Sequence, residues 1–130
     1  MTRRSRRARV VVGRFWLGPQ AVELVATATG NGGHVVTKPP TPGPAVVTVA
    51  CADSWPVVVG LLVHELGELA LRNVGGEYIP AVDEACATDG YAFMFNHAQF
   101  GEAAARVGAL LAVALPAFRR AYRAVHRAER

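Results

Sequence analysis

The chain has 130 residues, of which 52% are hydrophobic, and it carries a formal net charge of +4. A chain of this length and apolar content can bury a core, which excludes general disorder. No apolar run reaches the roughly 18–20 residues that a helix needs to span a bilayer. The basic start of the chain lacks the apolar stretch and cleavage site of a signal peptide. We therefore expect a cytoplasmic protein without a transmembrane segment.

The charges are distributed unevenly along the chain. Residues 1–14 hold six arginines and no acid, and residues 106–130 hold six more arginines against the single acid Glu129. A solvated tail and an ordinary basic helix would explain this pattern. The alternative is contact with nucleic acid, an anionic surface or an acidic partner. Because no zinc-finger spacing or RNA-binding strand motif is present, the basic ends alone predict weak, salt-sensitive binding.

The two cysteines, Cys51 and Cys86, fit a reducing compartment in which thiols stay free. A disulfide between them is the less favoured alternative. Cysteine usage therefore agrees with a cytoplasmic location.

The first half of the sequence predicts a small sheet. Residues 1–8 indicate a disordered basic arm, and residues 9–130 indicate one domain. Residues 9–17 are rich in β-branched and aromatic side chains and predict a strand. Residues 21–29 fit either a strand or a short helix, and we favour a strand. Residues 45–52 predict a buried strand.

A loop is expected at residues 30–44, which contain four prolines and four glycines. His34 lies in this segment among glycines. We expect its side chain to be exposed to solvent rather than to bind a ligand.

The second half of the sequence predicts helices. Asp53 or Ser54 caps a helix that has Pro56 in its first turn and runs to about Arg72. Pro80 then opens a short helix over residues 81–90. Residues 91–95 either continue that helix or form an extended segment.

The last helix is expected to run from His97 to about Glu129, with Asn96 as its cap and a kink at Pro116. We expect His126 to lie at the surface of this helix. The order of three strands followed by three helices predicts an α+β domain, with a small sheet and its helices packed on one side.

The central helix contains an unusual group of polar residues. In the segment VVVGLLVHELGELAL, residues 57–71, the only titratable side chains are His64, Glu65 and Glu68. Burying them among valines and leucines is costly unless they have partners, so the segment lines a site or pairs with another element. His64 and Glu68 are four residues apart and share a helix face. Glu65 projects about 100° round from His64.

The HELGE sequence resembles the active-site helix of the zincin metallopeptidases, whose motif is His-Glu-x-x-His. In that family the two histidines bind zinc, and the glutamate is the general base. The resemblance implies that His64 is a metal ligand and that Glu65 is a catalytic base. The chain departs from the motif at Glu68, which replaces the second histidine. Glu68 can bind zinc through oxygen, and its negative charge favours a harder metal such as manganese.

A zinc site with an open position needs a third ligand, and we expect it to be His97. This residue follows an apolar run and lies at a helix start, where the electropositive terminus favours the neutral, ligating imidazole. Asp89 is the alternative, either as a ligand or as an acceptor that orients His97. Asp83, Glu84 and Cys86 are weaker candidates.

Each of these residues also has an ordinary structural interpretation. His64 would be a hydrogen-bonded core histidine, Glu65 or Glu68 would form an ion pair with Arg72, and His97 would cap or pack. A further similarity, to small proteins of bacterial phages and prophages, rests on the HELGE helix and on the HAQF turn of residues 97–100. This similarity implies no activity.

Two functions therefore follow from the sequence. The first is a zincin-like, metal-dependent hydrolase of peptide or amide bonds. The second is a non-catalytic phage or prophage protein, virion-associated if phage-encoded, whose basic termini contact nucleic acid or an acidic partner.

Overall fold

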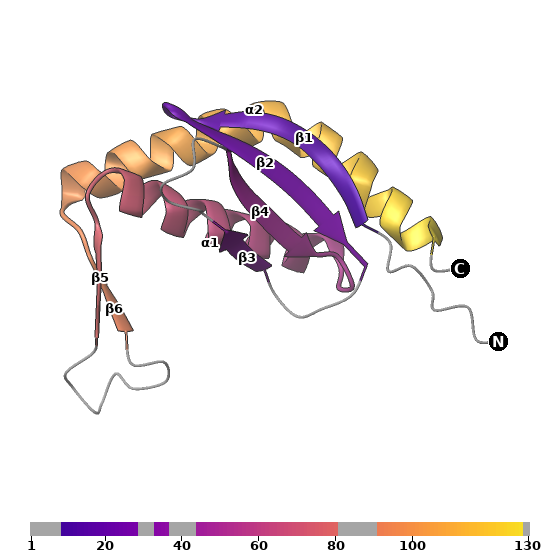
Figure 1. Ribbon diagram of the computed structural model, residues 1–130, viewed down its shortest axis with the longest axis horizontal. Coiled ribbons are helices and arrows are strands. Elements are labelled where there is room, and N and C mark those ends of the chain that lie inside the picture. The colour runs from indigo at the N-terminus through magenta and orange to yellow at the C-terminus, as the bar shows by residue number, and fades with distance from the viewer. Residues whose placement is uncertain (1–8, 29–32, 37–43, 81–90, 129–130) are drawn as a thin grey trace.

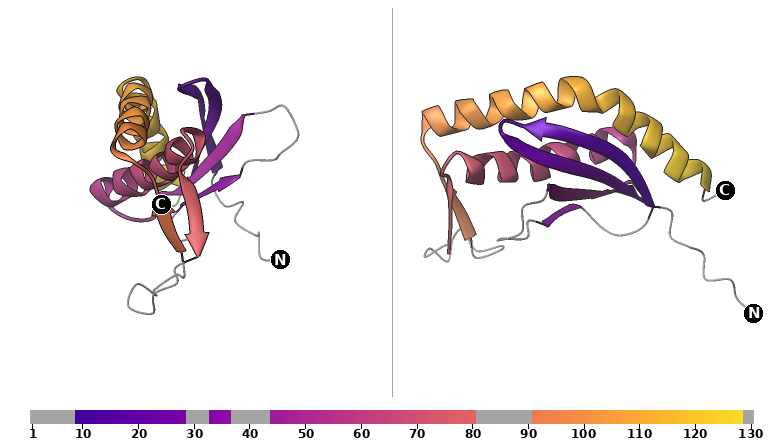
Figure 2. Two further views of the ribbon diagram at one scale, coloured as in Figure 1. Left: turned by 90° about the vertical axis from the view of Figure 1, so that its left-hand side faces the viewer. Right: turned by 45° about the horizontal axis from the view of Figure 1, so that its top comes forward.

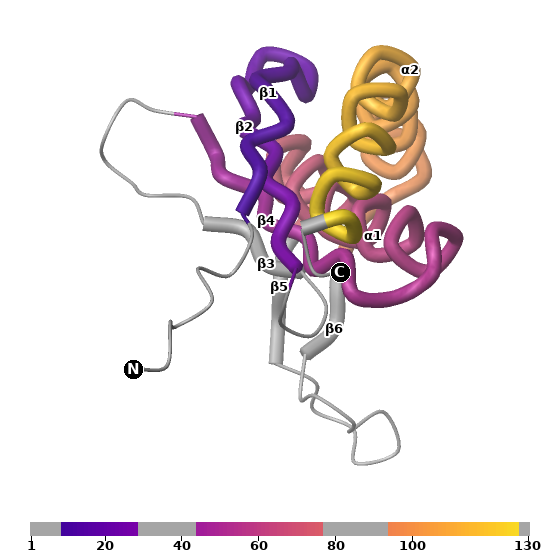
Figure 3. The backbone as a smooth tube through the Cα atoms, turned by 90° about the vertical axis from the view of Figure 1, so that its right-hand side faces the viewer, coloured from indigo at the N-terminus to yellow at the C-terminus, as the bar shows by residue number. Residues whose placement is uncertain are grey.

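A computed structural model describes residues 9–28, 33–36, 44–80 and 91–128 of the chain (Figure 1). In chain order the elements are β1 (Arg9–Leu17), β2 (Gln20–Thr27), β3 (Gly33–Val36), β4 (Ala45–Ala50), α1 (Trp55–Asn73), β5 (Glu77–Pro80), β6 (Tyr91–Met94) and α2 (His97–Ala128). The arm expected at residues 1–8 and the short helix expected at residues 81–90 lie outside these ranges. Both helices lie on one face of the main sheet (Figures 2 and 3), so the expected α+β class is confirmed.

The main sheet has four strands in the order β1-β2-β4-β3. The outer pairs β1–β2 and β3–β4 are antiparallel, and the central pair β2–β4 is parallel. The strand favoured for residues 21–29 is confirmed as β2. Gly18, in the turn between β1 and β2, has φ +58, and a Cβ there would meet the Arg106 side chain at 2.7 Å. This turn therefore requires glycine for its backbone conformation, and a larger residue there would displace the Arg106 side chain.

Two expected elements were wrong. A loop was expected at residues 30–44, and a helix was expected to begin at Pro80, but both places contain a strand. The segment 30–44 contains β3, which pairs antiparallel with β4 and places His34 opposite Thr48 in register. The side-chain exposure expected of His34 lies outside what the structure describes.

Glu77–Pro80 forms β5, which pairs with β6 in a separate two-stranded sheet. Residues 91–94 are therefore extended rather than helical. The hairpin of β5 and β6 projects from the ends of the two helices (Figure 1).

The core lies between the inner face of the four-stranded sheet and the two helices. Its fully buried side chains come from alternate positions of β2 and β4 and from the inner faces of both helices, and the largest include Leu24, Val47, Leu62, Leu66 and Phe118. The alternation in the strands and the three- and four-residue spacing in the helices produce these two apolar surfaces. Packing them together is the main stabilising contribution to the fold.

The ends of the helices follow the sequence signals closely. Helix α1 has Pro56 in its first turn, and the backbone amide of Gly76 closes its end on the carbonyl of Leu71. At α2, the amide of Gln99 donates to Oδ1 of Asn96 at 2.8 Å. The amide of Asn96 donates in return to Oε1 of Gln99 at 2.9 Å. This reciprocal pair satisfies two amides that would otherwise lack partners, and it confirms Asn96 as the cap.

The second half of α2 is tied to the start of α1. The Tyr122 hydroxyl donates to the carbonyl of Asp53 at 2.9 Å, and the Tyr122 ring packs edge-on against Trp55. The helix continues through Pro116, and its axis bends in the second half (Figure 2). His126, expected at the surface, is half-buried. Its ring lies 4.3 Å from that of Tyr122, one turn earlier on the helix.

Candidate metal site

The structure brings His64 and Glu68 together on α1. Nε2 of His64 lies 3.2 Å from Oε1 of Glu68. The side chain of His64 is 62% exposed and that of Glu68 is 30% exposed. The pair therefore lies on the solvent side of the helix rather than in the core. One nitrogen and one carboxylate oxygen stand next to each other where a dissolved ion could reach them.

Glu65 follows a different direction from its neighbour. It is 8% exposed and is the one buried charged side chain among those whose exposure the structure describes. The turn of about 100° between successive helix residues carries Glu65 toward the inner side of α1. The Glu65 carboxylate and the His64 ring thus leave the helix into different surroundings. From the sequence alone, both side chains were expected to reach the same small volume.

His97 lies at the exposed start of α2, beside the far end of α1. Nε2 of Gln99 donates to the carbonyl of Val74 at 3.2 Å, which fixes the start of α2 next to the residue that follows α1. His64 is ten residues before Val74, or about 15 Å along the helix axis. The structure therefore does not bring His97 to His64. Asp89, Asp83, Glu84 and Cys86 lie outside the described residues.

His64 and Glu68 supply two of the donors that a divalent metal needs. A histidine nitrogen and a carboxylate oxygen are ordinary ligands of zinc and manganese. Across residues 9–28, 33–36, 44–80 and 91–128, no group of three or more His, Cys, Asp and Glu residues is placed to hold an ion. The contact between His64 and Glu68 has the i, i+4 spacing that also produces ordinary ion pairs on helices, as Glu102 and Arg106 show on α2.

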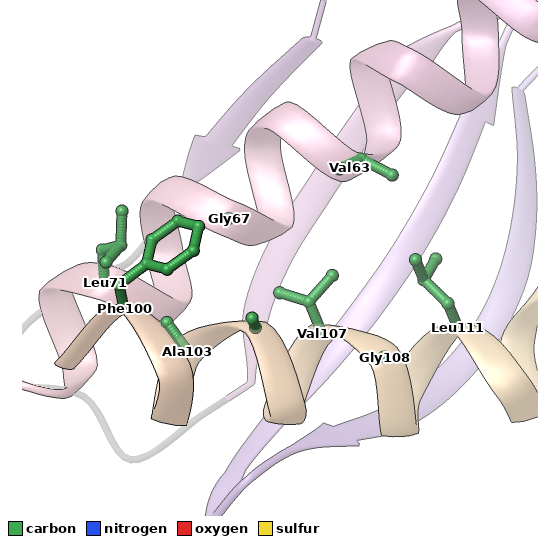
Figure 4. Close-up of a pocket in the computed structure, with 9 residues that line it drawn as sticks. Val63, Gly67, Leu71, Phe100, Ala103, Val107, Gly108 and Leu111 are labelled. Carbon is green, nitrogen blue, oxygen red and sulfur yellow. The ribbon is translucent and has the colours of Figure 1, made fainter. Parts of the chain in front are cut away.

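Sequence reasoning missed an apolar groove between α1 and α2 (Figure 4). Its volume is about 350 Å³, and it is lined by Val63, Gly67, Leu71, Phe100, Ala103, Ala104, Val107, Gly108 and Leu111. The lining residues on α1 are spaced four apart, and His64 and Glu68 each follow one of them in the chain. Small residues at Gly67 and Gly108 leave the space open. A glycine on each of two helices was the available signal, but pairing the helices required the fold.

Cys51 contributes no reactive group to this region. Its side chain is fully buried at the end of β4 and forms no disulfide. Burial raises the pKa of its thiol from 9.0 to about 11, against a smaller opposing effect of a backbone hydrogen bond at Thr27. A thiol with this pKa stays protonated at neutral pH and is a poor nucleophile or metal ligand.

No protein-family model, no curated protein and no solved structure matches this chain. Its function therefore has to be argued from the residues themselves.

Proposed function

We propose that the chain binds a divalent metal through His64 and Glu68 and acts as a zincin-like, metal-dependent hydrolase of peptide or amide bonds. The observation that carries the proposal is the 3.2 Å contact between Nε2 of His64 and Oε1 of Glu68 on an accessible face of α1. Zinc is the metal that we favour, and manganese is the alternative because Glu68 supplies a hard oxygen donor.

The residues have separate roles in this proposal. His64 and Glu68 hold the ion. Asp89 is the candidate third donor, because His97 lies about 15 Å from His64 along the helix axis. A bound zinc or manganese ion would polarise a carbonyl and make water a better nucleophile. Glu65 would accept the proton of that water. Its buried position requires the inner side of α1 to open toward the site during the reaction. The groove beside the pair would receive apolar side chains of the substrate.

Metal content is the first measurement. Protein purified without chelators should carry close to one equivalent of zinc or manganese by elemental analysis. Chelator should then lower its melting temperature, because a metal that binds only the folded state stabilises that state. His64→Ala and Glu68→Ala should each lose the metal. Glu68→His, which restores two histidines, should bind zinc at least as tightly as the natural chain.

A matched control distinguishes a metal site from an ordinary ion pair between two side chains of one helix. Glu102→Gln breaks the other i, i+4 pair, in which Nε of Arg106 lies 3.1 Å from Oε1 of Glu102, without removing a proposed ligand. It should leave metal content unchanged. The third donor is tested by His97→Ala and Asp89→Asn separately. If the natural chain holds no divalent metal and chelator leaves its melting curve unchanged, His64 and Glu68 are an ordinary surface pair.

The second candidate function is a non-catalytic interaction protein. The observation that favours it is the set of exposed arginines on the second half of α2, at positions 119, 120, 123 and 127. These side chains, together with the basic residues 1–14, would contact an acidic partner or nucleic acid. Such binding should weaken steeply as salt rises.

A further inference from the structure

Helix α2 has more apolar surface than the core uses. Of the helices described, it alone is long and apolar enough to cross a bilayer by length and composition. Only 22% of its most apolar 18-residue window is buried. A core helix of a globular domain normally buries its apolar face. The remaining apolar surface of α2 therefore faces solvent in the isolated chain.

The uncovered surface combines small and large side chains. On α2 its members are Ala105, Ala109, Ala112 and Val113, all exposed, and Val113 is 70% exposed. Phe100, which is 51% exposed, stacks on Phe95 with ring centroids 5.6 Å apart. The apolar groove between the helices continues this surface toward Val63 on α1 (Figure 4). We refer to Ala105, Ala109, Ala112 and Val113 as the apolar outer face.

Arginines continue the same side of α2 toward its C-terminus. Arg119, Arg120, Arg123 and Arg127 are exposed, and no acidic residue occurs between positions 103 and 128. Glu102, the acid nearest to them on this helix, accepts a hydrogen bond from Nε of Arg106. The charge beside the apolar outer face is therefore positive.

The uncharged part of α2 is shorter than the hydrocarbon layer of a bilayer. The uncharged run from Val107 to Phe118 covers about 18 Å, against a hydrocarbon thickness of about 30 Å. The inner side of α2 also packs on the sheet through Ala114 and Phe118. A helix that packs on the sheet with one side fits along a bilayer surface, with its apolar side chains among the acyl chains and its arginines near the headgroups.

We propose that the apolar outer face and the four arginines of α2 bind the surface of a bilayer that contains anionic lipids. Lipid satisfies both features at once, because anionic headgroups balance the arginines while acyl chains cover the exposed alanines and Val113. A second copy of the chain would cover the apolar residues but would leave the arginines without acids. Nucleic acid would pair with the arginines but would leave the apolar residues in water. The proposal uses neither of the proposed metal ligands His64 and Glu68.

Vesicle co-sedimentation tests this proposal with the full chain. The protein should partition onto phosphatidylcholine vesicles containing phosphatidylglycerol, and much less onto phosphatidylcholine alone. Val113→Asp and Ala112→Asp should each lower the partition coefficient by roughly tenfold, because a charge must enter the apolar layer. The double variant Arg120→Glu with Arg123→Glu should lower it by at least tenfold. Each of these side chains is exposed, so thermal melting should confirm that the variants fold.

Matched controls lie on β1. Val11→Asp introduces the same charge at another exposed valine, and Arg9→Gln with Arg14→Gln removes two other exposed arginines. Both should retain most of the binding. The proposal is overturned if acidic vesicles bind no protein at low salt, or if Val113→Asp binds as tightly as the natural chain. It is also overturned if sedimentation shows a dimer of the natural chain that Val113→Asp dissociates, because a second copy then covers the face.

Discussion

His64 and Glu65 are consecutive in the chain but lie in opposite environments. The side chain of His64 is 62% exposed, whereas Glu65 is 8% exposed and faces the inner side of α1. The proposed ligand and the proposed base are therefore on different sides of one helix. A substitution at Glu65 can therefore test hydrolysis separately from metal binding by His64 and Glu68.

Glu65→Gln should keep both the fold and the metal. The amide is close in shape to the carboxylate, and Glu65 is not a proposed ligand. We expect any hydrolysis of peptide or amide bonds to fall by about 10²–10⁴, the usual contribution of a general base. Steady-state rates, metal content and melting temperature should be measured on the same preparation. A variant that hydrolyses as fast as the natural chain would exclude Glu65 as the base.

The two helix starts should respond differently to truncation of their caps. Asn96→Ala removes the side-chain oxygen that accepts from the amide of Gln99 and should destabilise the fold by about 1 kcal/mol. Ser54→Ala is the matched control, because Ser54 caps α1 without a side-chain hydrogen bond. Urea denaturation should show little change in the free energy of unfolding of Ser54→Ala. Equal losses for both variants would contradict the role assigned to Asn96.

Two phenylalanines on α2 should differ in their contribution to stability. Phe118 is fully buried against the sheet and α1, so Phe118→Ala should cost about 3–5 kcal/mol in the free energy of unfolding. Phe100 is half-exposed at the rim of the groove, and Phe100→Ala should cost less than about 1 kcal/mol. Chemical denaturation of the two variants would compare them directly. Similar losses would mean that Phe100 is buried in solution.

The buried thiol of Cys51 should make the fold sensitive to alkali. Its pKa is 9.0 in the unfolded chain and about 11 in the folded chain, so the folded state keeps the proton more tightly. Stability from this group is therefore complete below pH 9 and is lost as pH rises from 9 through 11. The loss approaches about 2–3 kcal/mol, since each unit of pKa difference corresponds to about 1.4 kcal/mol. Cys51→Ala should lose less stability over the same window, as measured by urea titrations at each pH.

The strong local signals in the sequence predicted the major elements. Helix α1 was marked by Pro56 in its first turn, and α2 was marked by Asn96 as its cap. Such signals act over one turn of backbone, so they are visible without the fold. The β-branched and aromatic side chains of residues 9–17 identified β1, and the apolar run of residues 45–52 identified β4.

The elements that the sequence did not reveal depend on distant partners. Strand β3 has four residues between Gly- and Pro-rich segments, and its hydrogen bonds come from β4. Pro80 was interpreted as a helix start, whereas it ends β5, which pairs with β6. The contact of His64 with Glu68 was predictable because both lie on one helix. The burial of Glu65 and the distance to His97 depend on how α1 and α2 pack.

The strand order β1-β2-β4-β3 divides the sheet into two hairpins that meet along the parallel pair of β2 and β4. Each hairpin closes within a short stretch of chain, but the parallel pair joins Val22 to Ala45 and Thr27 to Ala50, far apart in sequence. Closing this longer loop costs more chain entropy before any contact forms. Folding should therefore begin with two independent hairpins, and their docking should set the folding rate. Substitutions at the β2–β4 junction should then slow folding, whereas those in the turn at Gly18 should mainly change how soon the first hairpin forms.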